Sequence, residues 1–197
     1  MTDARPPSSL ATLPLPHVVE GEYLSLRNVT PEDASEVYTN WMNDPDVNRY
    51  TESRFARHTQ ESIRQYIEAI ISAETNLFLA IIAREGDLHI GNIKLSDIDH
   101  NHGTAEVGII IGDKSCWGRG YGSETIDLLA GYAFTTLGLR KLTAGIYVTN
   151  TGSIRAFEKA GFGLEGMMKE QYISDGKAID AVRLGRLRPP PTAGSRT

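Results

Sequence analysis

Residues 116–123, Cys-Trp-Gly-Arg-Gly-Tyr-Gly-Ser, constrain the fold and the function of this chain more than any other segment. They follow an apolar run at residues 107–111 and precede an amphipathic run at residues 125–137. This pattern predicts a glycine-rich turn between a strand and a helix. Such a turn exposes backbone N–H groups at the positive end of the helix dipole. The sequence therefore predicts a turn that binds a phosphate or a pyrophosphate.

Length and composition predict one folded domain. The 197 residues are 40% hydrophobic and 23% charged, which is typical of a soluble globular domain. Residues 1–19 are rich in Pro, Ser and Thr and are expected to form a flexible leader. Residues 188–197 are expected to form a disordered C-terminal tail. The folded domain is therefore expected at residues 20–187.

Charge and cysteine content disfavour several classes of protein. A net charge of -5 argues against bulk binding of nucleic acid, because phosphate backbones attract clustered Lys and Arg. The single cysteine, Cys116, permits neither an intramolecular disulfide nor a cysteine-based zinc cluster. No apolar run reaches the roughly 18 residues of a membrane span, and the N-terminus lacks the apolar core of a signal peptide. We expect a cytoplasmic protein with no metal, no nucleic-acid partner and no membrane partner.

Hydrophobic periodicity predicts seven strands and four helices. Strands are expected at residues 23–27, 77–83, 88–95, 104–111, 141–148, 163–173 and 178–187, and helices at residues 30–42, 59–71, 125–137 and 150–160. A polar loop is expected at residues 43–58. Hairpins on either side of one strand–helix–strand crossover predict a mixed sheet with helices on its faces, rather than a doubly wound fold.

The first two helices carry local start signals. Thr30 followed by Pro31 predicts the start of the first helix, which should end before Asp44-Pro45. Thr59 is a candidate cap of the second helix. The second helix has helical spacing of apolar residues and is expected to bury one stripe, made of Ile63, Tyr66, Ile67, Ile70 and Ile71.

Four motifs follow one another along the chain. They are Trp41-Met-Asn-Asp-Pro-Asp-Val, residues 105–109, residues 117–124 and residues 150–162. In this order they resemble the W-x-N-D-P-x-V signature, the fourth strand, the acyl-CoA pyrophosphate loop and the helix after the fifth strand of the GNAT superfamily of N-acetyltransferases. Trp at position 117 is usual in the branch of ribosomal-protein alanine acetyltransferases, which the chain resembles within the superfamily. A lone glycine loop is a weak signal, whereas four motifs in order are a strong one.

The resemblance implies a fold and a cosubstrate. The fold is an α/β (mixed α+β) arrangement with a mostly antiparallel seven-stranded sheet, helices on both faces, and splayed fourth and fifth strands. The cosubstrate is acetyl-CoA, with its pyrophosphate on the backbone of residues 118–122 and its pantetheine arm paired with residues 109–111. The cofactor-binding residues expected on this basis are Ile109, Ile110, Ile111, Trp117, Gly118, Arg119, Gly120, Tyr121, Gly122, Ser123, Asn150, Ser153 and Phe157.

The resemblance also implies catalytic roles. Glu106 is expected to take the proton of the attacking amine, unless it is an ordinary solvent-facing strand residue. Asn150 is expected to bond near the pantetheine amide, to cap a helix, or both. Ser153 is a candidate donor to the departing thiolate. Phe157 stands where many relatives have a Tyr general acid, and a phenyl ring cannot donate a proton. Tyr172 is an alternative donor.

The acceptor amine is less constrained. Substrate-binding residues are expected at Trp41, Arg49, Tyr50, Arg54 and Tyr172. Arg49 and Arg54 flank Tyr50, a pattern that suits a phosphate and a stacked base or an unspecialised surface loop equally well. A small amine, such as a free or nucleotide-linked amino sugar, is the favoured acceptor.

Other interpretations of the sequence stay open. The acceptor is alternatively the N-terminal amine of a ribosomal or other protein, a polyamine, an amino acid or a drug amine. A non-catalytic acyl-CoA-binding sensor or scaffold is the alternative from another class. The sequence is compatible with either a monomer or a homodimer.

Overall fold

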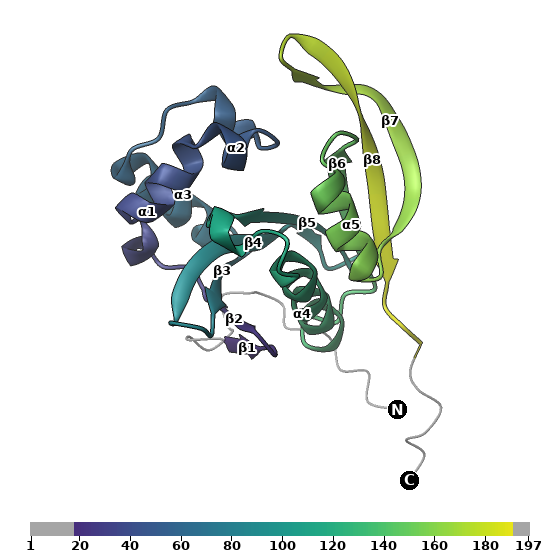
Figure 1. Cartoon of the computed structure of the whole chain (residues 1–197). Coiled ribbons are helices and arrows are strands. Elements are labelled where there is room, and N and C mark those ends of the chain that lie inside the picture. Colours follow the sequence, from purple (N-terminus) through teal and green to yellow (C-terminus); the bar gives the residue numbers. More distant parts are fainter. Residues whose placement is uncertain (1–17, 191–197) are drawn as a thin grey trace.

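The computed structural model of the protein describes residues 18–190, and one eight-stranded sheet runs through this region with helices on both faces (Figure 1). The strands are β1 (Val18–Glu20), β2 (Leu24–Asn28), β3 (Leu77–Ala83), β4 (Leu88–Asp99), β5 (Thr104–Ile111), β6 (Lys141–Tyr147), β7 (Gly163–Ser174) and β8 (Lys177–Leu187). The α-helices are α1 (Glu36–Asn43), α2 (Pro45–Asn48), α3 (Gln60–Ser72), α4 (Tyr121–Thr135) and α5 (Thr151–Lys159). Short 3-10 helices are η2 (Pro31–Asp33), η3 (Glu52–Phe55) and η4 (Lys114–Cys116).

The sheet has the order β1-β2-β3-β4-β5-β6-β8-β7, and every neighbouring pair is antiparallel except β5 and β6. This confirms the expected mixed, mostly antiparallel sheet. The expected number of seven strands was wrong, because β1 pairs with β2 and begins within the segment expected to be a leader. The remainder of that leader (1–17) and most of the expected tail (191–197) lie outside the described residues.

The parallel pair β5–β6 is joined at one end only. The ladder joins residues 104–106 of β5 to residues 141–143 of β6. Beyond Glu106, β5 continues to pair with β4 as far as Ile111, and β6 continues to pair with β8 as far as Tyr147. The two strands therefore separate after Glu106, and this confirms the expected splay of the two central strands.

Helices cover both faces of the sheet, and β3 shows how. All seven residues of β3 are buried. Leu79 and Ile81 belong to the core beneath α4, whereas Phe78, Ala80 and Ile82 belong to the core beneath α1 and α3. Because side chains alternate between the two faces of a strand, a central strand covered on both sides is apolar throughout. The α1/α3 face and the α4/α5 face thus form two separate layers (Figure 1).

The segment between β2 and α3 is more structured than expected. The predicted helix at residues 30–42 is broken, because Ser35 accepts a hydrogen bond from the Tyr38 amide and starts α1 afresh. The predicted polar loop at residues 43–58 was also wrong. The Asp44 side chain accepts from the Asp46 amide and caps α2, in which Pro45 is the first residue. The end of α1 at Asn43 agrees with the expected stop before Pro45.

Helix α3 begins as expected but buries a narrower stripe. Thr59 accepts from the Ser62 amide and caps the helix. Ile63 and Ile67 are buried, whereas Tyr66 and Ile71 are 41% and 45% exposed. The Tyr66 ring instead lies edge-on to the Phe78 ring, with centroids 5.9 Å apart.

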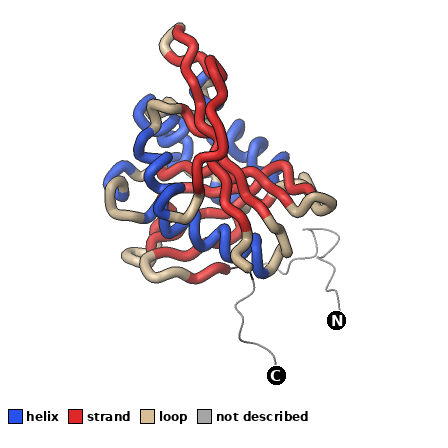
Figure 2. Tube along the Cα trace, turned by 90° about the vertical axis from the view of Figure 1, so that its right-hand side faces the viewer, coloured by secondary structure: helices blue, strands red, loops and turns tan. Residues whose placement is uncertain are grey.

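The β7–β8 hairpin extends beyond the body of the molecule (Figures 1 and 2). Its outer strand, β7, ends the sheet, and most of its residues are exposed. Within residues 18–190, no helix combines the length and the apolar character that a membrane crossing requires.

Candidate active site

The glycine turn between β5 and α4 has the backbone conformation that its sequence predicts. Gly118 and Gly120 have φ of 74° and 89°, and Gly120 is the N-cap of α4. This left-handed region suits glycine, which has no Cβ to clash. A Cβ built on either residue would meet no atom within 4 Å, so the turn faces open space. The backbone N–H groups of the turn lie at the N-terminus of α4, where the helix dipole is positive.

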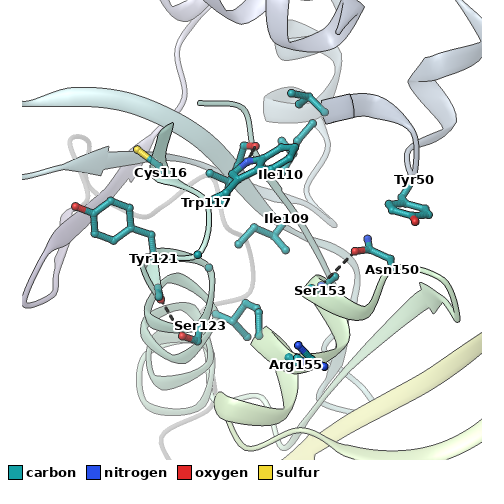
Figure 3. Close-up of a pocket in the computed structure, with 18 of the residues that line it drawn as sticks. Tyr50, Ile109, Ile110, Cys116, Trp117, Tyr121, Ser123, Asn150, Ser153 and Arg155 are labelled. Carbon is teal, nitrogen blue, oxygen red and sulfur yellow. Dashed lines mark hydrogen bonds between the residues drawn. The ribbon is translucent and has the colours of Figure 1, made fainter. Parts of the chain in front are cut away.

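A cavity of about 530 Å³ lies beside this turn. Figure 3 shows Trp117, Tyr121 and Ser123 on one side of it and Ile109 of β5 in the middle. On the other side lie Asn150, just before α5, and Ser153 and Arg155 of α5. Asn150 accepts from the Ser153 amide at 3.2 Å, which confirms that Asn150 caps α5. We call this space the turn cavity.

Most residues expected to bind the cosubstrate line the turn cavity. They are Ile109, Ile110, Ile111, Trp117, Gly118, Gly120, Tyr121, Gly122, Ser123, Asn150 and Ser153. Arg119 does not line it, because its guanidinium points away to Glu85 at 3.0 Å. Phe157 does not line it either, because its ring packs edge-on against Phe162 in the core. Arg119 and Phe157 thus lie off the wall of the turn cavity, and their contact with the cosubstrate stays a prediction.

Backbone groups on the open side of β5 face the gap between the strands. The Gly112 amide donates to Ile90 of β4, and backbone groups of alternate residues along a strand point to opposite neighbours. The groups of Ile109 and Ile111 therefore face the gap, and those of Ile110 face β4. Trp117 Nε1 donates to the Ile111 carbonyl at 2.9 Å, which gives that oxygen a donor already. On this side, Ile109 has no partner strand within residues 18–190.

Sequence analysis missed two basic residues of the turn cavity, Arg155 and Lys159, which line it from α5. Arg49, which was expected at the acceptor, also lines this cavity from the end of α2. Arg155 and Lys159 are four residues apart, a spacing that places both on one side of a helix. That spacing, in the helix opposite a glycine turn, is the signal that would have found them.

A second cavity of about 670 Å³ opens on the α1/α3 face of the sheet, and we call it the acceptor cavity. Its wall is mainly apolar, with Tyr38, Met42, Ile63, Phe78 and Phe157 among its members. It shares six wall residues with the turn cavity, namely Tyr50, Thr51, Ile109, Ile110, Asn150 and Ser153. The two cavities therefore meet where β5 and β6 separate.

Glu106 lies at the point where the strands separate. Arg183 holds its Oε2 at 2.8 Å and also donates to Thr143 Oγ1 at 2.8 Å. Glu106 Oε1 has no hydrogen bond within residues 18–190, and it lies 3.7 Å from the position of a Cβ on Gly145. Gly145 lines the acceptor cavity, whereas Glu106 itself lines neither cavity and lies next to this glycine. No sequence motif predicted the contact of Arg183 with Glu106, because the two residues are 77 positions apart in the chain.

Tyr172 lies beside Glu106 but lines neither cavity. Its hydroxyl is 3.5 Å from the Cβ position on Gly145, and its ring stacks on Tyr147 with centroids 4.2 Å apart. Burial, and then the charge of Glu106, raise the pKa of Tyr172. Its hydroxyl therefore keeps its proton at neutral pH and can act as a hydrogen-bond donor.

The residues expected to bind the acceptor are divided by the structure. Tyr50 lines both cavities, but Arg49 lines only the turn cavity. Arg54 lines neither, because it donates to Thr51, Tyr147 and Ile173 and ties η3 to the sheet. Trp41 is a core residue with 8% exposure, packed against Gly112. The expected grip of Arg49 and Arg54 on a phosphate around Tyr50 is thus not formed.

Comparison with known proteins gives one family match and several relatives. Residues 24–163 match the acetyltransferase (GNAT) domain family. The uncharacterized N-acetyltransferase p20 of Bacillus licheniformis is 31% identical over 170 residues, which span 85% of this chain and 94% of p20. The spermidine N(1)-acetyltransferase of Vibrio cholerae is 32% identical over 95 residues, which span 48% of this chain and 54% of that enzyme.

Solved structures agree with the fold. The spermidine N-acetyltransferase of Vibrio cholerae in complex with CoA and spermine superposes with a TM-score of 0.75. The match covers 85% of this chain and 96% of that chain at 24% identity. At this level of identity, the likeness concerns the arrangement of the elements.

Proposed function

Because the chain belongs to the GNAT acetyltransferase family and is an acyltransferase, we propose that it moves an acetyl group from acetyl-CoA directly to the primary amine of a small molecule. The observation that carries this proposal is the meeting of two cavities at the split between β5 and β6. One cavity has a glycine turn for a diphosphate, and the other has Gly145 in its wall, next to the Glu106 carboxylate. The arrangement brings a thioester and an amine together from opposite sides.

The turn cavity fits acetyl-CoA, which supplies the thioester. The N–H groups of residues 118–122 and the start of α4 suit the pyrophosphate, and Arg155 and Lys159 suit a further phosphate. The backbone of Ile109 suits the amides of the pantetheine arm. These groups are on the wall of one cavity, and a Cβ at Gly118 or Gly120 would project into open space. This fit supports acetyl-CoA as the cosubstrate.

Glu106 is proposed as the general base. An alkyl amine is mostly protonated at pH 7, yet it must be neutral to attack the thioester carbon. Arg183 orients the carboxylate through Oε2, so that Oε1 is left to accept the amine proton. The C–N bond forms, the C–S bond breaks, and the sulfur leaves as thiolate. Arg183 acts as a positioning residue for this step.

Ser153 is proposed to donate a hydrogen bond to the departing sulfur, because it lies on the wall shared by both cavities. A thiolate is already a tolerable leaving group near neutral pH. We therefore expect Ser153→Ala to lower kcat by only about 3- to 10-fold, a typical range for the loss of one neutral hydrogen bond. Asn150 keeps the cap of α5 in this variant. Steady-state kinetics with saturating acetyl-CoA measures the change, and an unaltered kcat would remove Ser153 from the mechanism.

The acceptor is proposed to be a small molecule because the acceptor cavity is lined by helices α1 and α3 and is mainly apolar. A free amino sugar stays a candidate, but the argument for a nucleotide-linked one lost its support with Arg54. A polyamine is a second candidate, because relatives are named spermidine acetyltransferases. Placement in the branch of ribosomal-protein alanine acetyltransferases rests on residues 41–47 and Trp117, and it predicts a protein N-terminus as acceptor.

The proposed function is tested by release of free CoA thiol from acetyl-CoA. The purified protein is incubated with amino sugars, amino acids, polyamines and a peptide with N-terminal alanine. We expect thiol release with at least one small amine and an acetylated product by mass spectrometry. Binding of acetyl-CoA without turnover of any amine would contradict the proposal, and turnover of the peptide alone would assign the acceptor to proteins.

A further inference from the structure

We infer that the acceptor cavity contains a subsite for an oxyanion, formed by Lys94 and Asn92 of β4, and that the acceptor is an amine carrying a carboxylate or a phosphate. This inference deepens the proposed function and rests on it. It differs from the expectation of a polyamine, which would bring only cationic groups into the cavity. Both subsite residues lie on the sheet floor of the cavity, away from the glycine turn.

Asn92 is the first observation. Its side chain is 2% exposed and lines the acceptor cavity. His89 Nε2 lies 2.9 Å from the Gly91 carbonyl and 3.1 Å from Asn92 Oδ1, which assigns the proton to Nε2 and the oxygen of Asn92 to that side. Asn92 Nδ2 has no acceptor within residues 18–190. A buried amide donor without an acceptor is costly, so a ligand acceptor at this position is favoured.

Lys94 is the second observation. Its stem lies across Gly108, where a Cβ would meet Lys94 Cε at 3.3 Å, so the glycine makes room for the side chain. Lys94 is half-buried and lines the cavity, and it forms no ion pair or hydrogen bond with the described part of the chain. A cation held among apolar side chains without a counterion attracts an anionic ligand.

Charge on the remainder of the wall agrees with this assignment. The charged wall residues are Glu52, Arg57 and Lys94. Glu52 already accepts from Tyr147 and pairs with Arg54. These wall residues carry one net positive charge, and the neighbouring Glu106 carboxylate is paired with Arg183, so the charge balance favours an acceptor with a negative group.

The subsite lies within reach of the reacting nitrogen. Glu106 pairs with Ser96, Gly108 with Lys94, and Ile110 with Asn92. Lys94 and Asn92 are thus one and two rungs from Glu106 on the same face of the sheet, at about 7 Å per rung. An amine at Glu106 can reach Lys94 with an anion about 7 Å from its nitrogen, whereas Asn92 lies about 14 Å along the strand from Glu106. Phe78 and Tyr38 offer an apolar surface for the remaining part of the molecule.

The test compares two matched pairs of amines by calorimetry on protein saturated with CoA. Phenylalanine and phenethylamine differ by a carboxylate, and glucosamine 6-phosphate and glucosamine differ by a phosphate. Spermidine is the cationic probe. We expect the anionic member of at least one pair to bind about 10- to 100-fold more tightly than its partner, as for a hydrogen-bonded charge pair. The pair that shows this preference identifies carboxylate or phosphate.

Variants of Lys94 connect that preference to the subsite. Lys94→Met retains the stem over Gly108 and is expected to remove most of the preference. The anionic amine should bind more weakly, whereas the affinity for the neutral partner should change less than about 3-fold. Lys94→Arg keeps the charge and should keep the preference. Lys177→Met, at the exposed first residue of β8, removes the same charge elsewhere and should leave the preference unchanged.

Three results would overturn the inference. These are equal binding of both members in both pairs, a preference that survives Lys94→Met, and tightest binding of spermidine. None of them depends on turnover, because calorimetry records binding alone. Failure of the proposed function is recorded separately, as bound amines that release no CoA thiol from acetyl-CoA.

Discussion

Replacing Glu106 by Gln is expected to lower kcat/KM for the acceptor amine by about 10²- to 10⁴-fold at pH 7, the usual contribution of a positioned general base. The Gln side-chain oxygen can still accept from Arg183, so the local packing should persist. What is lost is the capacity of Oε1 to take a proton. The effect is measured by initial rates of CoA thiol release at subsaturating amine.

The pH dependence separates this role from a structural one. An alkyl amine has a pKa of about 10, so the fraction of neutral amine grows as the pH rises. The difference between the wild type and Glu106→Gln should therefore shrink steadily between pH 7 and pH 9.5. Tyr172 does not interfere, because burial and the nearby Glu106 charge raise its pKa and keep it protonated in most of this range.

A matched control for this variant is Glu68→Gln. Glu68 is an exposed residue of α3, and its replacement removes the same charge far from the split. It should leave both rate and pH profile unchanged. If Glu106→Gln lost the same factor at every pH, Glu106 would be an orienting residue and the base would have to be sought elsewhere.

Replacing Gly120 by Val is expected to weaken acetyl-CoA binding about 100-fold or more, because hydrogen bonds to a charged group are each worth about 1.5–3 kcal/mol. Gly120 has φ of 89°, a conformation that a β-branched residue adopts only under strain. Relief of that strain would turn the N–H groups away from the diphosphate. The same strain is expected to cost about 1–2 kcal/mol of folding stability.

Calorimetry with acetyl-CoA, together with thermal unfolding, separates the two effects. Wild-type protein at 100 times the dissociation constant should gain about 2.7 kcal/mol of stability, and the variant should gain much less at the same concentration. Gly131→Ala is the control, because Gly131 lies in the interior of the same helix with open space around its Cβ position. It should stabilise the protein by up to about 1 kcal/mol and leave binding unchanged. A wild-type dissociation constant in Gly120→Val would refute the assignment of the turn.

The sequence predicted those parts of the molecule that short-range patterns specify. The glycine turn, the Thr59 cap and the stop of α1 before Pro45 each depend on a few consecutive residues. The residues of the turn cavity were found because one motif contains most of them. The prediction was wrong at residues 43–58, whose polar composition indicated a loop. There the Asp44 side chain caps a short helix, α2.

The remainder of the site depends on contacts between distant strands. Arg183 meets Glu106 only because β8 lies beside β6 in the sheet, which no spacing along the chain reveals. Lys94 and Asn92 look like ordinary polar residues of a strand until pairing places them on the floor of a cavity. The prediction for Arg54 was wrong for the opposite reason. Its local pattern suggested phosphate binding, but its guanidinium instead donates to the Ile173 carbonyl of β7.

The one-ended pairing of β5 and β6 has a consequence for how tightly the protein can bind. Each of the two strands is anchored on its outer side, β5 by β4 and β6 by β8. The opening is therefore a preorganised feature of the folded chain. Because folding itself separates the two strands, a ligand that binds between them requires little further reorganisation of the protein, and little binding free energy is lost.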